Sequence, residues 1–188
     1  MAHRFKPEHM DRLLSTEREK MISPETVWKE LGVTVSSVLA DIGAGPGFFA
    51  IRGAKLTHGA VHAVDIEPQM LERLSQRAAE EGLTTVQTHE GNAQAIPLPD
   101  HTADQTLCAF VLHEVDDLAK ALGELRRITK PGGRVGMLEW EKKDTPFGPP
   151  LHERLAAAEL IQAAKAAGFV EVTEMKPNDV NYLLVCTV

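Results

Sequence analysis

Apolar residues in this chain of 188 residues gather in short runs that alternate with stretches of helical spacing. The runs are bounded by turn residues and indicate buried strands, whereas the stretches between them place apolar side chains on one helical face. Strands are expected at 35–42, 60–65, 85–89, 102–112 and 134–140, and helices at 48–55, 68–82, 118–129 and 151–167. Strands that alternate with helices predict a parallel sheet with helices on both faces.

The two ends of the chain depart from this alternation. Residues 169–175 and 180–188 are apolar runs joined by a Lys-Pro-Asn-Asp turn, which predicts an antiparallel hairpin. Residues 7–31 favour two short helices, because Ser23 and Pro24 suit the N-cap and first position of the second one. We therefore expect a single α/β domain, with N-terminal helices over 1–34 and a core over 35–188. Its sheet has seven mostly parallel strands, the last of them antiparallel.

Composition and charge narrow the class of protein. With 43% hydrophobic and 25% charged residues, the chain suits a globular domain that needs no disulfide. Its two cysteines, Cys108 and Cys186, lie in apolar runs, which favours reduced thiols and no metal site. A net charge of −7 disfavours a nucleic-acid partner. Without a signal peptide or a run of the ~20 apolar residues that span a bilayer, we expect a cytoplasmic protein.

The first expected strand opens into a glycine-rich loop, Asp-Ile-Gly-Ala-Gly-Pro-Gly, from Asp41 to Gly47. Gly43, Gly45 and Gly47 let the backbone turn sharply and leave space for a ligand. A dinucleotide-binding G-x-G-x-x-G pattern would require glycine where Phe48 stands, so the spacing speaks against a pyrophosphate. The carboxylate of Asp41 would likewise repel a pyrophosphate and attract a cationic group.

A second acidic residue, Asp65, ends the second expected strand. A carboxylate at this place can accept hydrogen bonds from both hydroxyls of a ribose. Glycine turns and terminal aspartates each occur as ordinary caps. Their order within one strand-helix-strand unit nevertheless indicates an adenosine-containing ligand with a cationic end.

The run from Val38 to Gly47, Val-Leu-Ala-Asp-Ile-Gly-Ala-Gly-Pro-Gly, resembles motif I of the class I S-adenosylmethionine-dependent methyltransferases. Later segments, 91–100, 107–115 and 125–135, resemble the family's loop after the third strand, its motif IV and its Pro-Gly-Gly turn. They are most similar to the small-molecule, quinone-methyltransferase-like branch. The resemblance implies a Rossmann-like fold, S-adenosyl-L-methionine as cofactor and methyl transfer to a small-molecule acceptor.

The same resemblance implies a cofactor site drawn from four segments of the chain. The glycine loop contributes Asp41, Gly43, Ala44, Gly45 and Gly47; Asp65 holds the ribose; Ile66 and Met70 flank the adenine; Asn92 and Ala93 meet its edge; and the backbone near Phe110 receives the methionine amino group. Met70 is equally compatible with an ordinary place in the helix core.

Candidate catalytic residues follow the fourth and fifth expected strands. A methyl sulfonium is already activated, so the enzyme mainly aligns the nucleophile and excludes water, and a base is optional. Where the acceptor needs deprotonation, His113 and Glu139 are the candidates, with Glu114 beside them. His113 also suits a pocket wall or a helix cap, and Glu139 a solvated strand end. No metal is expected.

Other functions and partners stay open. One is a cofactor-binding protein without catalysis; a nicotinamide-dependent oxidoreductase is disfavoured by Asp41 and Phe48. The sequence has no Asn/Asp-Pro-Pro-Tyr pattern after the fourth strand, which further disfavours amines of nucleic acids as acceptors. So short a chain leaves little protein for a deep pocket, so we expect one that is open or completed by a partner in a homo-oligomer. N-terminal candidates for a lid are His3, Phe5, His9 and Arg12.

Overall fold

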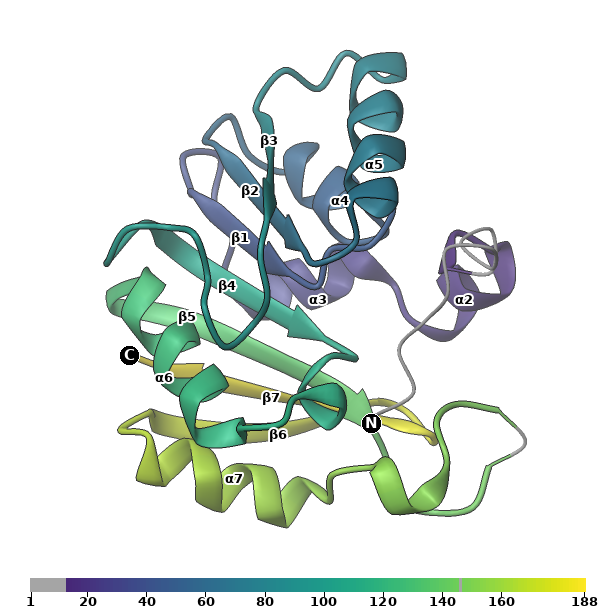
Figure 1. Cartoon of the computed structure of the whole chain (residues 1–188), viewed down its shortest axis with the longest axis vertical. Coiled ribbons are helices and arrows are strands. Elements are labelled where there is room, and N and C mark those ends of the chain that lie inside the picture. The colour runs from purple at the N-terminus through teal and green to yellow at the C-terminus, as the bar shows by residue number, and fades with distance from the viewer. Residues whose placement is uncertain (1–12, 146) are drawn as a thin grey trace.

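The computed structural model describes residues 13–145 and 147–188. At its centre lies a seven-stranded sheet with the strand order β3-β2-β1-β4-β5-β7-β6 (Figure 1). The strands are β1 (Leu39–Ile42), β2 (Val61–Asp65), β3 (Val86–Glu90), β4 (Ala103–Ala109), β5 (Thr129–Trp140), β6 (Val170–Asn178) and β7 (Asn181–Thr187). Only the pairs of β7 with β5 and β6 are antiparallel. The predicted α/β fold, with a mostly parallel sheet and an antiparallel last strand, is confirmed.

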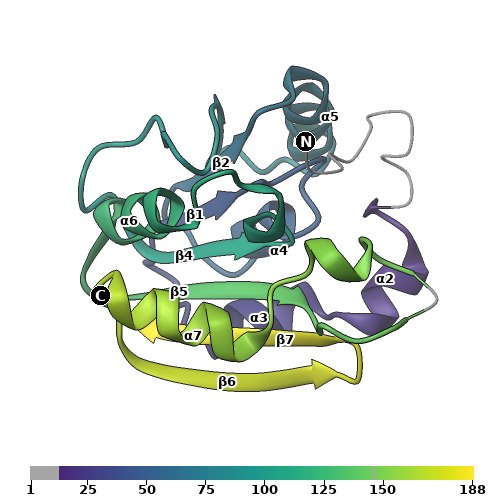
Figure 2. The same cartoon turned by 60° about the horizontal axis from the view of Figure 1, so that its bottom comes forward.

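Helices cover both faces of this sheet (Figures 1 and 2). They are α2 (Thr16–Met21), α3 (Pro24–Glu30), α4 (Ala50–Ala54), α5 (Pro68–Glu80), α6 (Leu118–Ile128) and α7 (Ala157–Ala166), with 3₁₀ turns η2 (Leu112–Glu114) and η3 (Leu151–Glu153). Trp28 and Leu74 anchor α3 and α5 in one apolar core, while Leu122 and Leu160 anchor α6 and α7 in the other. Burial of these side chains, at ~25 cal/mol per Å² of apolar surface, stabilises the layers.

Local signals in the sequence place several helices as expected. Ser23 caps α3, because its Oγ accepts a hydrogen bond from the Thr26 amide at 3.3 Å, and Pro24 begins the helix. The Trp28 indole then donates to the Phe49 carbonyl at 2.9 Å and fastens α3 to α4. The predicted apolar face of α5 is likewise buried.

Several expected boundaries were wrong. The strand expected at 134–140 already begins at Thr129, and the strand expected at 169–175 runs on to Asn178, into the expected turn. The first strand begins at Leu39, because Thr34 donates its amide to Ser37 Oγ at 2.9 Å in a turn that keeps 35–37 out of the sheet. The fourth strand ends at Ala109. The helix expected at 151–167 is interrupted: the backbone is extended at Arg154, and α7 begins only at Ala157.

The carboxyl ends of β1, β2, β4 and β5 meet at one edge of the sheet, and α2 lies beside this edge (Figure 2). In parallel sheets ligands bind at this edge, because the loops that follow the strands come together there. In the described part of the chain, no helix is long and apolar enough to cross a membrane.

Candidate active site

The glycine-rich loop is held against the end of β2 by backbone hydrogen bonds. The amides of Gly43 and Ala44 donate to the Val64 carbonyl at 2.8 and 3.0 Å. The Gly45 amide donates to Asp65 Oδ2 at 2.7 Å. The structure therefore brings Asp65 onto the loop.

The glycines of this loop have positive φ angles, and two of them serve packing within the protein. A Cβ added to Gly43 would lie 2.1 Å from Val111 Cγ2, and one on Gly47 would lie 2.9 Å from Leu74 Cγ. At Gly45 the nearest atom would be Leu13 Cδ1, at 3.7 Å. The interpretation that all three glycines make room for a ligand is therefore too simple. Of the three, only Gly45 would meet no described atom closer than ordinary van der Waals contact.

Asp41 is buried, and no described cation contacts its carboxylate. Its side chain lies at the end of β1, and among the described residues neither of its oxygens accepts a hydrogen bond of ordinary geometry. Burial raises the pKa of Asp41 to about 7; the Ala50 amide and the Arg18 charge oppose this shift, and Asp65 adds to it. An ammonium group beside Asp41 would supply the missing donors. This orphaned carboxylate fits the cationic end of S-adenosylmethionine.

Unlike Asp41, the carboxylate of Asp65 is held in one orientation by hydrogen bonds. Its Oδ1 accepts a hydrogen bond from the Glu67 amide at 2.9 Å, in addition to the bond from Gly45 to Oδ2. Burial raises the pKa of Asp65 despite these two bonds. Each carboxylate oxygen keeps a second lone pair, so the group can still accept two ribose hydroxyls.

Arg18, on α2, is a residue that the sequence analysis missed. Its guanidinium lies 4.5 Å from the ring centroid of Phe48 and 5.4 Å from that of Phe110, at the carboxyl edge of the sheet. Its Nη1 donates to the Leu13 carbonyl at 3.0 Å. Burial lowers the pKa of Arg18 to about 10, and Asp41 opposes that shift. A positive and a negative group thus face the same site, as the amino-acid end of S-adenosylmethionine requires.

The backbone turns sharply at Phe110, directly after β4. Its φ of 61° is uncommon for a residue other than glycine, and its amide donates to the Leu138 carbonyl at 2.8 Å. Its ring lies 5.3 Å from that of Trp140, which in turn lies 5.9 Å from Phe147. The strained turn places Val111 against the glycine loop and starts an aromatic wall. Strain of this kind is common at functional sites.

His113 and Glu139, the two catalytic candidates, are in direct contact. His113 Nδ1 lies 2.7 Å from Glu139 Oε2, and the Leu112 amide donates to Glu139 Oε1 at 2.9 Å. The sequence analysis expected both residues near the ends of the fourth and fifth strands but did not predict their contact. The solvated strand end considered for Glu139 was wrong, because only 1% of its side chain is exposed.

The protonation of His113 follows from this contact. Burial lowers the pKa of His113, but the hydrogen bond to Glu139 and three nearby carboxylates outweigh burial and raise it above 6.5. Because a carboxylate faces Nδ1, this nitrogen carries the proton. Nε2 lies 3.8 Å from Glu114 Oε1, which is too long for a hydrogen bond. A neutral His113 can therefore accept a proton at Nε2.

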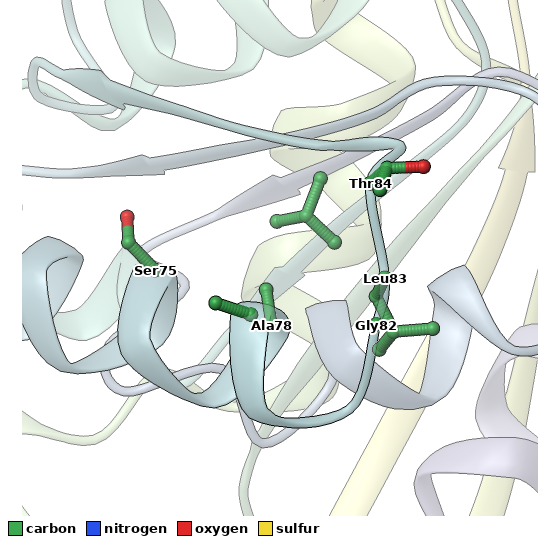
Figure 3. A pocket seen from close by; sticks show the side chains of 7 residues that line it. Ser75, Ala78, Gly82, Leu83 and Thr84 are labelled. Carbon is green, nitrogen blue, oxygen red and sulfur yellow. The ribbon is translucent and has the colours of Figure 1, made fainter.

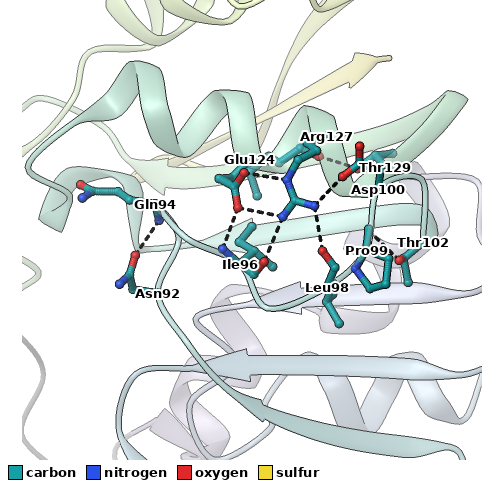
Figure 4. A network of polar contacts seen from close by, with 11 residues as sticks. Asn92, Gln94, Ile96, Leu98, Pro99, Asp100, Thr102, Glu124, Arg127 and Thr129 are labelled. Carbon is teal, nitrogen blue, oxygen red and sulfur yellow. Dashed lines mark hydrogen bonds and ion pairs between the residues drawn. The ribbon is translucent and has the colours of Figure 1, made fainter.

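The residues assigned to the adenine lie on α5 and on the loop after β3. Met70 is buried, whereas Ile66 is 38% exposed. Asn92 Oδ1 accepts the Gln94 amide at 2.9 Å, which folds 92–95 into a tight turn beside buried Ala93. Figure 4 shows this loop under Arg127 of α6. The adenine contacts themselves stay a prediction.

One hollow of the described structure lies apart from this site. This hollow, of about 410 Å³, opens between α5 and β3 (Figure 3). Its lining holds no titratable side chain: Ser75, Ala78, Ala79, Gly82, Leu83, Thr84 and Val86. The lid candidates His3, Phe5, His9 and Arg12 lie outside the described residues.

Comparison with known proteins identifies the family. The model of a methyltransferase domain matches residues 40–137. The chain is 32% identical over 139 residues to a ubiquinone/menaquinone biosynthesis C-methyltransferase of Marinomonas sp., which covers 72% of this chain and 55% of that protein. It is 29% identical over 204 residues to a demethylmenaquinone methyltransferase of Geobacillus kaustophilus, covering 90% and 86%. The chain thus spans about half the length of the first relative.

A solved structure agrees with these relatives. A SAM-dependent methyltransferase from Aquifex aeolicus superposes with a TM-score of 0.91 at 28% identity, and the match covers 98% of this chain and all of that one. The whole described fold, including the terminal hairpin, is therefore similar to that of a known methyltransferase.

Proposed function

Because the chain belongs to the class I S-adenosylmethionine-dependent methyltransferases, we propose that it transfers the methyl group of S-adenosyl-L-methionine to a small-molecule acceptor. The observation that carries this proposal is the 2.7 Å contact between His113 and Glu139. His113 lies two residues after Val111, whose side chain packs on the glycine loop. This contact would supply a proton acceptor beside the loop that we assign to the cofactor.

Each end of the cofactor has a partner in the structure. The ammonium group would face Asp41, the carboxylate would face Arg18, and the ribose hydroxyls would bind Asp65. Gly43, Ala44, Gly45 and Gly47 would line the site, Ile66 and Met70 would flank the adenine, and Asn92, Ala93 and the backbone at Phe110 would complete it. These roles combine what the family resemblance implies with the positions of the residues in the structure.

The bound cofactor would supply an activated methyl group, and the protein's own part is to orient the acceptor and to take its proton. Glu139 holds the His113 ring by its Nδ1–H, so that Nε2 is the basic atom. The contacting rings of Phe110, Trp140 and Phe147 would form an apolar wall beside a bound acceptor and so help to exclude water. An acceptor whose hydroxyl, amine or acidic carbon reaches Nε2 would lose its proton there.

The names of the relatives bear on the class of methyl acceptor. The names of two relatives describe methylation of quinone-type compounds, and this supports a small molecule without choosing one. The absence of a nucleic-acid partner, the cytoplasmic location and the homo-oligomer remain predictions from the sequence. So does the division into 1–34 and 35–188.

Calorimetric titration tests the proposal. The wild-type chain is expected to bind S-adenosylmethionine and S-adenosylhomocysteine in the micromolar range, about −8 kcal/mol, and not to bind a nicotinamide dinucleotide. Asp65→Ala should abolish most of this affinity, whereas Glu72→Ala, on the exposed side of α5, should not change it. If the wild-type protein binds neither S-adenosylmethionine nor S-adenosylhomocysteine, the proposed methyltransferase activity is refuted. Binding without turnover of any acceptor in a small-molecule screen would favour the non-catalytic alternative.

A further inference from the structure

The loop after β3 is fastened to the sheet at one end and to α6 at the other. At its start, the Gly91 amide donates to the Asp65 carbonyl at 3.0 Å, which ties the loop to the ribose-binding residue. The turn at 92–95 follows. Beyond it, Ile96 and Leu98 are buried, and their backbone groups meet two charged side chains of α6.

Arg127 supplies most of these backbone contacts. Its Nη2 donates to the Ile96 carbonyl at 2.9 Å, and its Nη1 donates to the Leu98 carbonyl at 2.8 Å (Figure 4). A second bond from Nη1 reaches Asp100 Oδ1 at 2.8 Å. One planar guanidinium therefore holds two backbone carbonyls of the loop, those of Ile96 and Leu98.

Glu124 completes the arrangement. Its Oε2 accepts the Ile96 amide at 2.7 Å, and its Oε1 accepts Arg127 Nε at 2.7 Å. The hydrogen bonds from Arg127 lower the pKa of Glu124, so the pair is ionised at neutral pH. The amide and the carbonyl of Ile96 are thus both bound by one ion pair on α6.

Burial of the Ile96 and Leu98 side chains alone would not fix the orientation of the loop backbone. Apolar burial holds a segment in the core but has no direction, whereas hydrogen bonds orient peptide planes. Recognition of adenine by Asn92 and by the Ala93 amide depends on where those groups point. The 92–95 turn is held at its two ends, Gly91 and Ile96, and from within by Gln94 Oε1, which accepts the Asp117 amide at 2.8 Å.

We propose that Arg127 and Glu124 are positioning residues for recognition of the nucleobase: they hold the 96–98 backbone so that Asn92 and the Ala93 amide meet the edge of the adenine. The inference rests on the proposed function, since it assumes that the cofactor binds at this loop. Neither residue touches the cofactor. Substitution of either residue should therefore weaken only the contacts made with the adenine end of the ligand.

The test compares two ligands that differ only in the base. The probes are S-adenosylhomocysteine and its hypoxanthine analogue, S-inosylhomocysteine, in which the donor and acceptor at the base edge are exchanged. Calorimetry on the full chain is expected to show that Arg127→Met weakens S-adenosylhomocysteine about 10-fold, the loss that one misplaced hydrogen bond causes, and that the preference for adenine shrinks. Arg126→Met, a change at the exposed neighbouring arginine, should leave both affinities unchanged.

Other outcomes would overturn the inference. Arg127→Met binding within about 2-fold of Arg126→Met would show that the contacts do not position the loop. Equal weakening of both ligands would show a general structural role. Glu124→Gln keeps an oxygen for the Ile96 amide but loses the charge, and is judged by the same criteria if Arg127→Met does not fold. Wild-type protein that binds neither ligand would instead refute the proposed function.

Discussion

The glycine-rich loop and the segment from Glu139 to Arg154 meet at the same edge of the sheet, but different interactions hold them. The loop is fastened by backbone amides that donate to the Val64 carbonyl and to Asp65, its neighbours on the adjacent strand. The second segment begins with Glu139 and Trp140, which pair with β7, and the Glu141 amide donates to the Val180 carbonyl. Beyond Glu141, one side chain holds the segment. Arg154 alone donates to the carbonyls of Glu141, Lys143, Phe147 and Pro149 and to Thr145 Oγ1.

This difference separates two tasks. A shape that depends on backbone hydrogen bonds tolerates few changes in φ, which suits a cofactor that does not vary. A shape that depends on a few side chains can be rebuilt by substituting them, which suits an acceptor site. Changes on the acceptor side should therefore affect chemistry or local stability without affecting cofactor affinity.

The largest effect is expected at the proton acceptor. His113→Gln removes the basic Nε2, and with an acceptor identified by the small-molecule screen it should lower kcat by ~10²–10⁴-fold, the usual contribution of a general base. Affinity for S-adenosylhomocysteine should stay within about 2-fold. His152→Gln, at a histidine whose side chain is 80% exposed, is the matched control. Unchanged kcat would show that the dyad only shapes the pocket.

Loss of Arg154 should have the next largest effect. Arg154→Met leaves several backbone carbonyls without donors, so the free energy of unfolding should fall by about 3 kcal/mol. Chemical denaturation measures this change. Arg154→Lys, with one compact ammonium in place of the planar fork, should recover little of it. If Arg154→Met also lowers affinity for S-adenosylhomocysteine, the two regions are coupled and the comparison above fails.

The same contrast explains what could be predicted from the sequence. The alternation of strands and helices, the antiparallel hairpin, and the places of the glycine loop and Asp65 at strand ends follow from periodicity and from the order of elements within one strand-helix-strand unit. Arg18 could not be found, because it lies in a run of alternating charges that resembles any exposed helix. The interrupted helix at 151–167 was missed because Arg154 is bound by a loop whose conformation no local pattern reports.

The smallest effect is expected on the cofactor side, and it depends on pH. The unfolded chain loses the Asp41 proton near pH 3.8, whereas the folded chain keeps it to about pH 7. Raising the pH across this window therefore destabilises the cofactor-free fold. At pH 8, Asp41→Asn should raise the free energy of unfolding by about 2 kcal/mol, and this gain should vanish below pH 4.

The control for Asp41→Asn should respond with the opposite sign. At Asp104, burial is outweighed by hydrogen bonds from Lys130 and from the Val38 amide, so the pKa is lowered. Its contribution to stability is present above its unfolded pKa and is lost as the pH falls. Asp104→Asn should thus destabilise the protein at pH 8, whereas Asp41→Asn stabilises it and weakens S-adenosylmethionine. Suppose that the two substitutions change the free energy of unfolding equally at pH 4 and at pH 8. Asp41 would then not be an unpaired buried charge, and its assignment to the cofactor's ammonium group would be refuted.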